Sequence, residues 1–201
     1  MRKTLVPVLT LGLAVVGLAA GCAQPPQAQI DAARTAVTSA SDTKVSVYAP
    51  DQFASMQDAQ SRLDAELAAQ EAKFFITRSY AEAEKLAAEV ETAAKQAAEA
   101  AAVAEEQAKN DATQLIADAK AALEAGVTTL ATAPKGKGTE ADLQAMQADL
   151  DGATTALTEA ETALGAMDYM EAKARAQAAK TSIDGVVAAV EAAKMARGGG
   201  R

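Results

Sequence analysis

Residues 79–130, SYAEAEKLAAEVETAAKQAAEAAAVAEEQAKNDATQLIADAKAALEAGVTTL, carry the longest helical pattern in the chain. Alanine, the best helix former, dominates this segment, and Gly126 is its only glycine or proline. Small and apolar residues recur there at steps of three and four, as one narrow packing face of a helix requires. The positions on this face are Ala83, Leu86, Val90, Ala94, Ala97, Ala101, Ala104, Ala108, Leu115, Ala119 and Leu123. We expect one helix that would span about 75 Å, with Asn110-Asp111 as a point where it could restart.

Signals for helix ends lie on both sides of this segment. Ser79 with Glu82 forms a capping box, which places the start of the long helix there. The segment 134–138, PKGKG, ends the helical pattern and is typical of a flexible, solvated connection. Thr139 can cap the helix that follows.

Four further helices are expected. One runs from about Gln27 to the mid-forties, where β-branched residues weaken it, and stops at Pro50. The next starts at Pro50, which suits a first helical position, and ends near 76–78. A helix over about 140–164 has the clearest heptad pattern, and the last begins at Asp168 with Glu171 as its capping partner. The apolar faces are Ile30, Ala33, Val37 and Ala40; Phe53, Met56, Leu63, Leu67 and Phe74; Leu143, Met146, Leu150, Ala153, Leu157, Ala160 and Leu164; and Ala172, Ala176, Ala179, Ile183, Val186 and Val190.

Composition agrees with this pattern, since alanine supplies 55 of the 201 residues. We therefore expect an all-α protein, an elongated antiparallel helical bundle with coiled-coil-like hairpins. Its expected parts are a first helical unit at 28–131, a linker at 132–139, a second helical hairpin at 140–197 and a disordered tail at 198–201.

A weak internal repeat relates the two units. Met56, Leu67 and Phe74 match Met146, Leu157 and Leu164 at a shift of 90, and Ser79-Tyr80-Ala81-Glu82-Ala83 matches Asp168-Tyr169-Met170-Glu171-Ala172 at a shift of 89. Each copy would be a helix, a tight turn with tyrosine at the first helical position, and an alanine-faced helix. Because such a hairpin cannot bury its apolar face alone, we expect the copies to pack on each other. The alternative is that alanine bias makes any two segments look alike.

The N-terminus has the layout of an export signal. Arg2 and Lys3 precede an apolar stretch that ends in small residues at Gly21, directly before the only cysteine, Cys22. The segment resembles a bacterial lipoprotein signal, with Ala19 where leucine is commonest. The resemblance implies a signal peptide at 1–21, cleavage between Gly21 and Cys22, a diacylglycerol thioether on Cys22, and an N-acyl chain such as palmitate. The alternatives are a buried or free thiol at Cys22 and an uncleaved membrane helix, for which the apolar stretch is short.

The same resemblance implies a location. Ala23 stands where enteric bacteria use aspartate to retain lipoproteins in the inner membrane, so the outer membrane is favoured if the source has two membranes. Otherwise we expect the outer face of the cytoplasmic membrane. Three acyl chains would anchor the protein stably, and 22–27 would be the lipidated cysteine and a stiff spacer.

Charge and composition exclude many function classes. Losing Arg2 and Lys3 with the signal lowers the formal net charge from -8 to -10, which argues against nucleic acid as a partner. The chain has no histidine or tryptophan, and acylation would consume its only thiol, so imidazole or thiolate metal sites, haem ligation and disulfides are not expected. Carboxylate pairs need a cleft, usually lined with aromatic residues, and the chain has three Tyr and three Phe. We expect no enzymatic activity and no cofactor besides the lipid.

Tyr48, Tyr80 and Tyr169 are the residues most open to an interaction role, as contacts for a sugar or peptide. The favoured interpretation is that each ring packs across a hairpin while its hydroxyl reaches water or backbone. The acidic runs at 82–91 and 105–106 could bind divalent cations, but with nearby lysines they are more typical of a solvated face.

Tyr48-Ala49-Pro50, after a lipoprotein signal and a leading helix, and followed by a second helix and a tyrosine turn, resembles the motif of an uncharacterised family of short Gram-negative lipoproteins. The resemblance covers about 28–102. It implies helical hairpins and an envelope location, and it adds no mechanism because the family has no established activity.

Two functions remain open from the sequence. The first is a membrane-anchored envelope lipoprotein with a structural or scaffold role, which presents helix faces to itself or to another envelope protein. The alternative is a binding module for a cell-wall component or small ligand in the groove between the helical hairpins.

Overall fold

The structure is a computed structural model that describes residues 24–41, 43–136 and 139–198. In chain order the elements are α1 (Gln27–Ala40), α2 (Thr43–Tyr48), α3 (Pro50–Glu71), the short 3-10 helix η1 (Phe75–Thr77), α4 (Ala81–Ala131), α5 (Glu140–Gly165) and α6 (Tyr169–Gly198). The predicted all-α helical bundle is confirmed, and these three ranges contain no strand.

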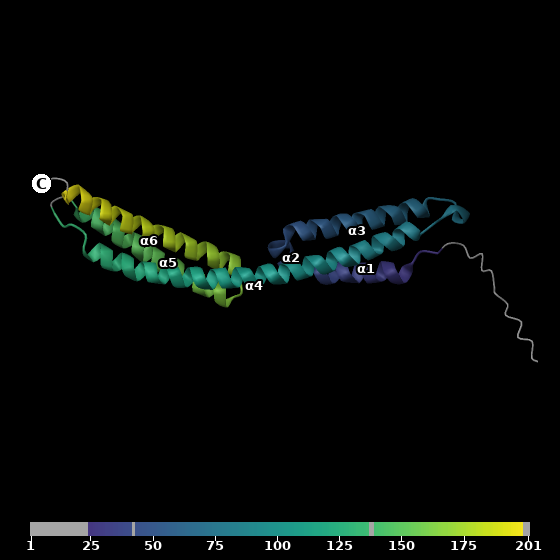
Figure 1. Ribbon diagram of the computed structural model, residues 1–201, viewed down its shortest axis with the longest axis horizontal. Coiled ribbons are helices and arrows are strands. Elements are labelled where there is room, and N and C mark those ends of the chain that lie inside the picture. Colours follow the sequence, from purple (N-terminus) through teal and green to yellow (C-terminus); the bar gives the residue numbers. More distant parts are fainter. Residues whose placement is uncertain (1–23, 42, 137–138, 199–201) are drawn as a thin grey trace, which may run out of the picture.

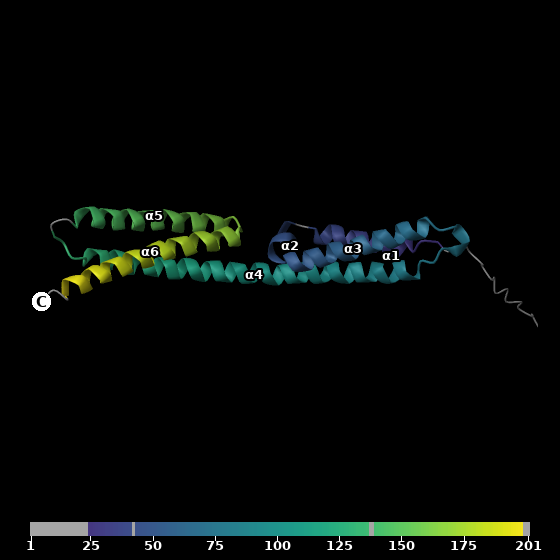
Figure 2. The same ribbon diagram turned by 90° about the horizontal axis from the view of Figure 1, so that it is seen from above.

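The molecule is a rod built along α4. The 51 residues of this helix run without interruption through Asn110 and Asp111, so the helix does not restart there. α1, α2 and α3 pack along its N-terminal half, and α5 and α6 pack along its C-terminal half (Figures 1 and 2). We call α1, α2, α3 and residues 81–101 the first bundle, and residues 115–131, α5 and α6 the second bundle. Residues 102–114 of α4 form the junction.

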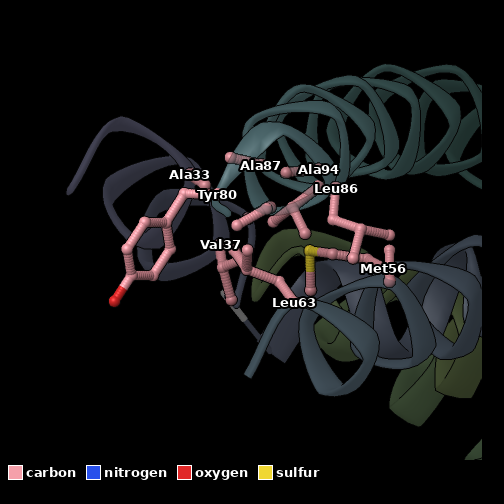
Figure 3. Packing of buried hydrophobic residues seen from close by; sticks show 12 residues of the cluster. Ala33, Val37, Met56, Leu63, Tyr80, Leu86, Ala87 and Ala94 are labelled. Atoms are coloured by element: carbon pink, nitrogen blue, oxygen red, sulfur yellow. The ribbon is translucent and has the colours of Figure 1, made fainter. Parts of the chain in front are cut away.

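The first bundle has a core of a few large side chains among many alanines. Met56 and Leu63 of α3 are fully buried and lie against Leu86 of α4 and Val37 of α1 (Figure 3). Ala33, Ala83, Ala87 and Ala94 complete this face, and their methyl groups let the helices approach closely. The predicted apolar faces of α1 and of the first half of α4 are confirmed by this burial.

The second bundle contains the heptad face predicted for 143–164. Leu150, Ala153, Leu157 and Ala160 are buried, and they pack with Ile116 of α4 and Ile183 of α6. α4 approaches closely at Gly126, because a Cβ built there would lie 3.0 Å from Cγ2 of Ile183 and 3.4 Å from Cδ2 of Leu150. The face predicted for α6 is likewise buried at all six positions, from Ala172 to Val190.

The expectation that the two hairpins pack on each other is wrong. The first hairpin, α3 with the N-terminal half of α4, and the second hairpin, α5 with α6, lie end to end, and the second packs on the C-terminal half of α4 (Figure 2). Their turns also differ by more than the expected single residue, since 72–80 separates α3 from α4 and only 166–168 separates α5 from α6. The long helix removes the need for hairpin-on-hairpin packing, because it supplies a third helix to both bundles.

The first expected helix is in fact two helices. α1 ends at Ala40, and 43–48 forms the separate helix α2. At the end of α1 the Ser41 hydroxyl donates a hydrogen bond of 2.7 Å to the Val37 carbonyl, a local bond by which serine competes with helix continuation. The change of direction buries Val45 and Ala49 against Ala97 and Ala101 of α4.

α3 is shorter than predicted, and Phe74 is not part of its buried face. The helix ends at Glu71, and the guanidinium of Arg78 donates hydrogen bonds to the carbonyls of Glu71 (2.8 Å) and Lys73 (3.1 Å). These bonds take acceptors that are left free at a helix end. The chain then turns through η1, and the Phe74 side chain projects into solvent.

Two of the three predicted side-chain caps are not formed. Tyr80, not Ser79, occupies the cap position of α4, and neither provides a side-chain cap. The Thr139 hydroxyl bonds to Gly136 of the preceding turn instead of to α5. Asp168 does cap α6, because its carboxylate accepts a hydrogen bond of 3.2 Å from the Glu171 N–H.

Candidate functional site

The structure separates the three tyrosines that were predicted as interaction residues. Tyr80 belongs to the core of the first bundle, where its ring lies beside Ala33 and Val37 and its hydroxyl points away from Met56 (Figure 3). Tyr48 and Tyr169, which are 121 residues apart in sequence, meet at the junction. Tyr80 is thus packed within a core, and the contact at the junction needs a separate account.

A buried glutamine fixes the turn that carries Tyr80. The Gln70 side chain is the buried polar side chain of the described core, and its Oε1 accepts a hydrogen bond of 3.0 Å from the Ser79 N–H. Its amide nitrogen donates to Oε1 of Glu66 at 2.6 Å. Gln70 therefore satisfies a backbone donor at the entrance to α4, which the sequence analysis assigned to a capping box.

At the junction, Tyr48 connects the two bundles. Its hydroxyl oxygen accepts a hydrogen bond from the backbone N–H of Tyr169, the first residue of α6. The first N–H groups of any helix lack partners within the helix, so Tyr48 of α2 completes the cap that Asp168 begins. Tyr169 is buried, and its position is fixed by the turn 166–168.

The three residues of the Tyr-Ala-Pro motif have three separate structural roles. Tyr48 bonds to the second bundle, Ala49 is buried against Ala97 and Ala101 of α4, and Pro50 occupies the first position of α3. Proline is favoured there because its fixed φ suits the helix and its missing N–H would have no helical partner. The motif thus forms a corner of the fold and presents no free reactive group.

Ion pairs lie on both sides of the contact between Tyr48 and Tyr169. Lys44 of α2 lies 2.5 Å from Oε1 of Glu105, and Lys173 of α6 lies 2.7 Å from Oδ2 of Asp111. Hydrogen bonds from Lys173 and Gln107 lower the pKa of Asp111, so this carboxylate keeps its charge in mildly acidic solution. Burial, followed by the negative charges of Glu105 and Asp168, raises the pKa of Tyr48.

The chemistry of the junction is that of a structural contact. The carboxylates of Glu105 and Asp111 are paired with lysines. The Tyr48 hydroxyl accepts a hydrogen bond from the Tyr169 backbone. Across the described ranges, the side chains do not assemble three His, Cys, Asp or Glu in a geometry that could hold a metal ion. The acidic run at 82–91 contributes single ion pairs, Glu82 with Lys85 and Glu89 with Arg62.

Shallow grooves lie on individual bundles. One of about 460 Å³ runs between α1 and α4 beside Ala40 and Lys95, and one of about 670 Å³ lies between Gln52 and α4 around Ala100. Another, of about 350 Å³, follows α5 from Thr155 to the turn at Asp168. None of these three grooves has lining residues from both hairpins, so the groove that the ligand-binding alternative requires is not among them.

Sequence reasoning missed an exposed apolar cluster at one end of the rod. Phe74, Phe75 and Ile76, here named the apolar tip, are 65%, 48% and 70% exposed. The three residues are adjacent in sequence, but the spacing of Phe74 predicts a place on the buried face of α3. Three adjacent apolar residues, of which only Phe74 continues the spacing of α3, are the signal that could have identified the tip.

Gly21 and Cys22, the predicted cleavage and lipidation residues, lie outside the described ranges. Among the helices that the structure describes, none has the length and hydrophobicity to cross a bilayer. The chain matches no family model, and comparisons with curated proteins and with solved structures give no match.

Proposed function

We propose that this protein is a lipid-anchored lipoprotein of the bacterial envelope, with a non-catalytic role as a scaffold or as a surface for protein interaction. The observation that carries the proposal is Cys22, which follows a basic start, an apolar stretch and small residues in the order of a lipoprotein signal. The Tyr-Ala-Pro resemblance to short Gram-negative lipoproteins supports the same assignment. We place the protein at the outer membrane, facing the periplasm.

The shape supports a spacing or scaffold role. α4 alone is about 75 Å long at 1.5 Å per residue, and α1 begins near the end of the rod that holds the apolar tip (Figure 1). A lipid on Cys22 would therefore hold the rod by one end and leave the second bundle far from the membrane. Most of the long faces of α4 and α6 would then be accessible to a second copy or to another envelope protein.

The charge pattern is consistent with protein partners. The second bundle carries ion pairs at exposed positions, such as those of Arg175 with Glu159 (2.8 Å) and with Glu171 (2.6 Å). Exposed pairs of this kind add little stability, but they keep an elongated surface soluble and selective for complementary charge.

Lipidation is the direct test of the proposal. Cells that express the protein are grown with an alkyne-tagged palmitate, and the label on the protein and its membrane fraction are measured. We expect label and membrane recovery for the wild-type protein and loss of both label and signal cleavage for Cys22→Ser, because an alcohol cannot form the thioether. A mature wild-type protein with an unmodified Cys22 would contradict the anchor.

A matched variant tests the location separately. Ala23→Asp leaves the thiol in place, so we expect the same palmitate label as for the wild type. In a host that sorts lipoproteins by this position, the variant should move from the outer to the inner membrane fraction. Equal distribution of both proteins would refute the outer-membrane assignment and leave the lipid anchor intact.

A further inference from the structure

We propose that the apolar tip, Phe74, Phe75 and Ile76, inserts into the same membrane leaflet that holds the lipid on Cys22. The rod would then have two attachments to the bilayer, one covalent lipid and one protein wedge. This inference rests on the proposed function, because it takes the lipid on Cys22 as the first attachment.

The apolar tip exposes large hydrophobic side chains to water, and none of them joins a core cluster of the described residues. The rings of Phe74 and Phe75 contact each other, with centroids 4.7 Å apart and planes tilted by 56°, but they do not join the core of the first bundle. Moving apolar surface of this kind from water into hydrocarbon is favourable. Adjacent exposed aromatic and aliphatic residues at the end of an otherwise charged rod are typical of an interaction site.

Several backbone groups at and beside the apolar tip are hydrogen-bonded within its turn. The Phe74 carbonyl accepts hydrogen bonds of 2.8 Å from both the N–H and the hydroxyl of Thr77. The carbonyls of Glu71 and Lys73 accept bonds from Arg78, and the Ser79 N–H donates to Gln70. Unsatisfied backbone groups are the main cost of placing a loop in lipid, and these bonds remove that cost for the groups named here.

Two cations border the apolar tip. Lys73 precedes it and Arg78 follows it, in a chain whose formal net charge is -8. Basic side chains beside an apolar wedge lie at the level of lipid phosphates, where their charge is favourable and their methylene groups remain in the apolar region. The opposite end of the rod also carries cations, Lys135 and Arg197, so what distinguishes the tip end is the run of exposed apolar residues between Lys73 and Arg78.

The apolar tip and the proposed lipid lie at the same level of the rod. Arg34 of α1 and Asp64 of the antiparallel α3 form an ion pair at 3.7 Å, which fixes the register of the two helices. From that pair, α1 extends seven residues back to its first residue, Gln27, and α3 extends seven residues on to its last residue, Glu71. The start of α1 and the end of α3 therefore lie at the same level of the rod. The five residue-to-residue steps from Cys22 to Gln27 span at most about 18 Å. A leaflet that holds the lipid is thus within reach of the tip (Figures 1 and 2).

The test uses the full-length lipidated protein in phospholipid vesicles. Since lipidation consumes Cys22, the variant Ile76→Cys offers one thiol for an environment-sensitive fluorophore, and Met195→Cys places the same probe at the opposite end of the rod. Both positions are exposed, so neither variant disturbs the core. We expect the probe at position 76 to gain fluorescence several-fold and to be quenched by brominated lipids. The probe at position 195 should remain as in water.

Each alternative result has a definite meaning. A probe at position 76 that matches the probe at position 195, on a protein whose lipid is verified by mass spectrometry, overturns the insertion and leaves the lipid anchor standing. Brighter emission at position 76 without quenching by brominated lipids places the tip against protein and also overturns the insertion. A free thiol at Cys22 in the same mass spectrum contradicts the proposed function instead.

Discussion

The hydroxyl oxygen of Tyr48, the last residue of α2, accepts a hydrogen bond from the N–H of Tyr169, the first residue of α6. This contact joins two bundles whose cores are separate and which otherwise share α4. Ion pairs from Lys44 to Glu105 and from Lys173 to Asp111 attach the same two elements, α2 and α6, to the junction of α4. The end-to-end arrangement of the bundles is therefore held by α4 and by these few polar contacts.

Replacing Tyr48 by phenylalanine tests this contact with little change in volume. We expect Tyr48→Phe to lower the free energy of unfolding by about 0.5–1.5 kcal/mol, because the Tyr169 N–H loses its acceptor. Amide hydrogen exchange at Tyr169 should become faster, while exchange within the core of α5 stays the same. An unchanged exchange rate at Tyr169 would show that the hydrogen bond does not hold α6.

The raised pKa of Tyr48 predicts the sign of a pH effect. The folded protein holds the phenolic proton more tightly than the unfolded chain, whose tyrosine titrates near pH 10. The contribution of Tyr48 is therefore complete below pH 10 and is lost as the pH rises through the higher folded pKa. Urea unfolding at pH 9 to 11 should show a steeper loss of stability for wild type than for Tyr48→Phe, since lysine titration is common to both. An equal loss of stability for both proteins would contradict the raised pKa of Tyr48.

Much of this fold could be predicted from sequence because alanine-rich helices with regular apolar faces leave few alternatives. The burial of Leu150, Leu157 and Ile183 follows from heptad spacing alone. The arrangement of the bundles could not be derived, because spacing fixes which face is buried but not which helix covers it. α4 covers the buried faces of both hairpins, and its capacity to serve two bundles depends on its continuity through Asn110.

Less of the candidate site could be predicted. The three tyrosines stand out in the sequence, but the bond between Tyr48 and Tyr169 depends on tertiary packing across the junction. The exposure of Phe74 could not be predicted, because its register with Leu67 predicts a core position. Its exposure follows from the end of α3 at Glu71, which Arg78 stabilises through hydrogen bonds that no local propensity encodes.

The core of the second bundle should respond strongly to truncation of its leucines. Leu150→Ala or Leu157→Ala should each cost about 2–5 kcal/mol, because both side chains are buried and the surrounding alanines cannot fill the cavity. Val103→Ala is the control, since Val103 is exposed on α4 and its truncation should change stability by less than about 0.5 kcal/mol. Urea unfolding, monitored by circular dichroism, gives the midpoints of the wild type and the three variants. Equal midpoints for all four proteins would refute the burial of these leucines in a core.

Glycine positions give a pair of opposite predictions. Gly126→Val should destabilise the protein by about 1–3 kcal/mol, because its side chain would meet Ile183 and Leu150 in a packed interface. Gly152→Ala should stabilise it by about 1 kcal/mol, because the new methyl group meets no atom within 4 Å and alanine favours the helix. Thermal unfolding of both variants measures the two signs. A stabilising Gly126→Val would show that α4 does not approach the second bundle closely.

The distance between the two halves of α4 tests the rod most directly. Spin labels at Glu91→Cys and Glu124→Cys, exposed positions 33 residues apart, are introduced in the Cys22→Ser background and measured by pulsed dipolar spectroscopy. A continuous helix predicts one narrow distribution centred at about 50 Å. A distribution at much shorter distance would mean that α4 bends near Asn110 and that the two hairpins fold onto each other, which would contradict the end-to-end rod.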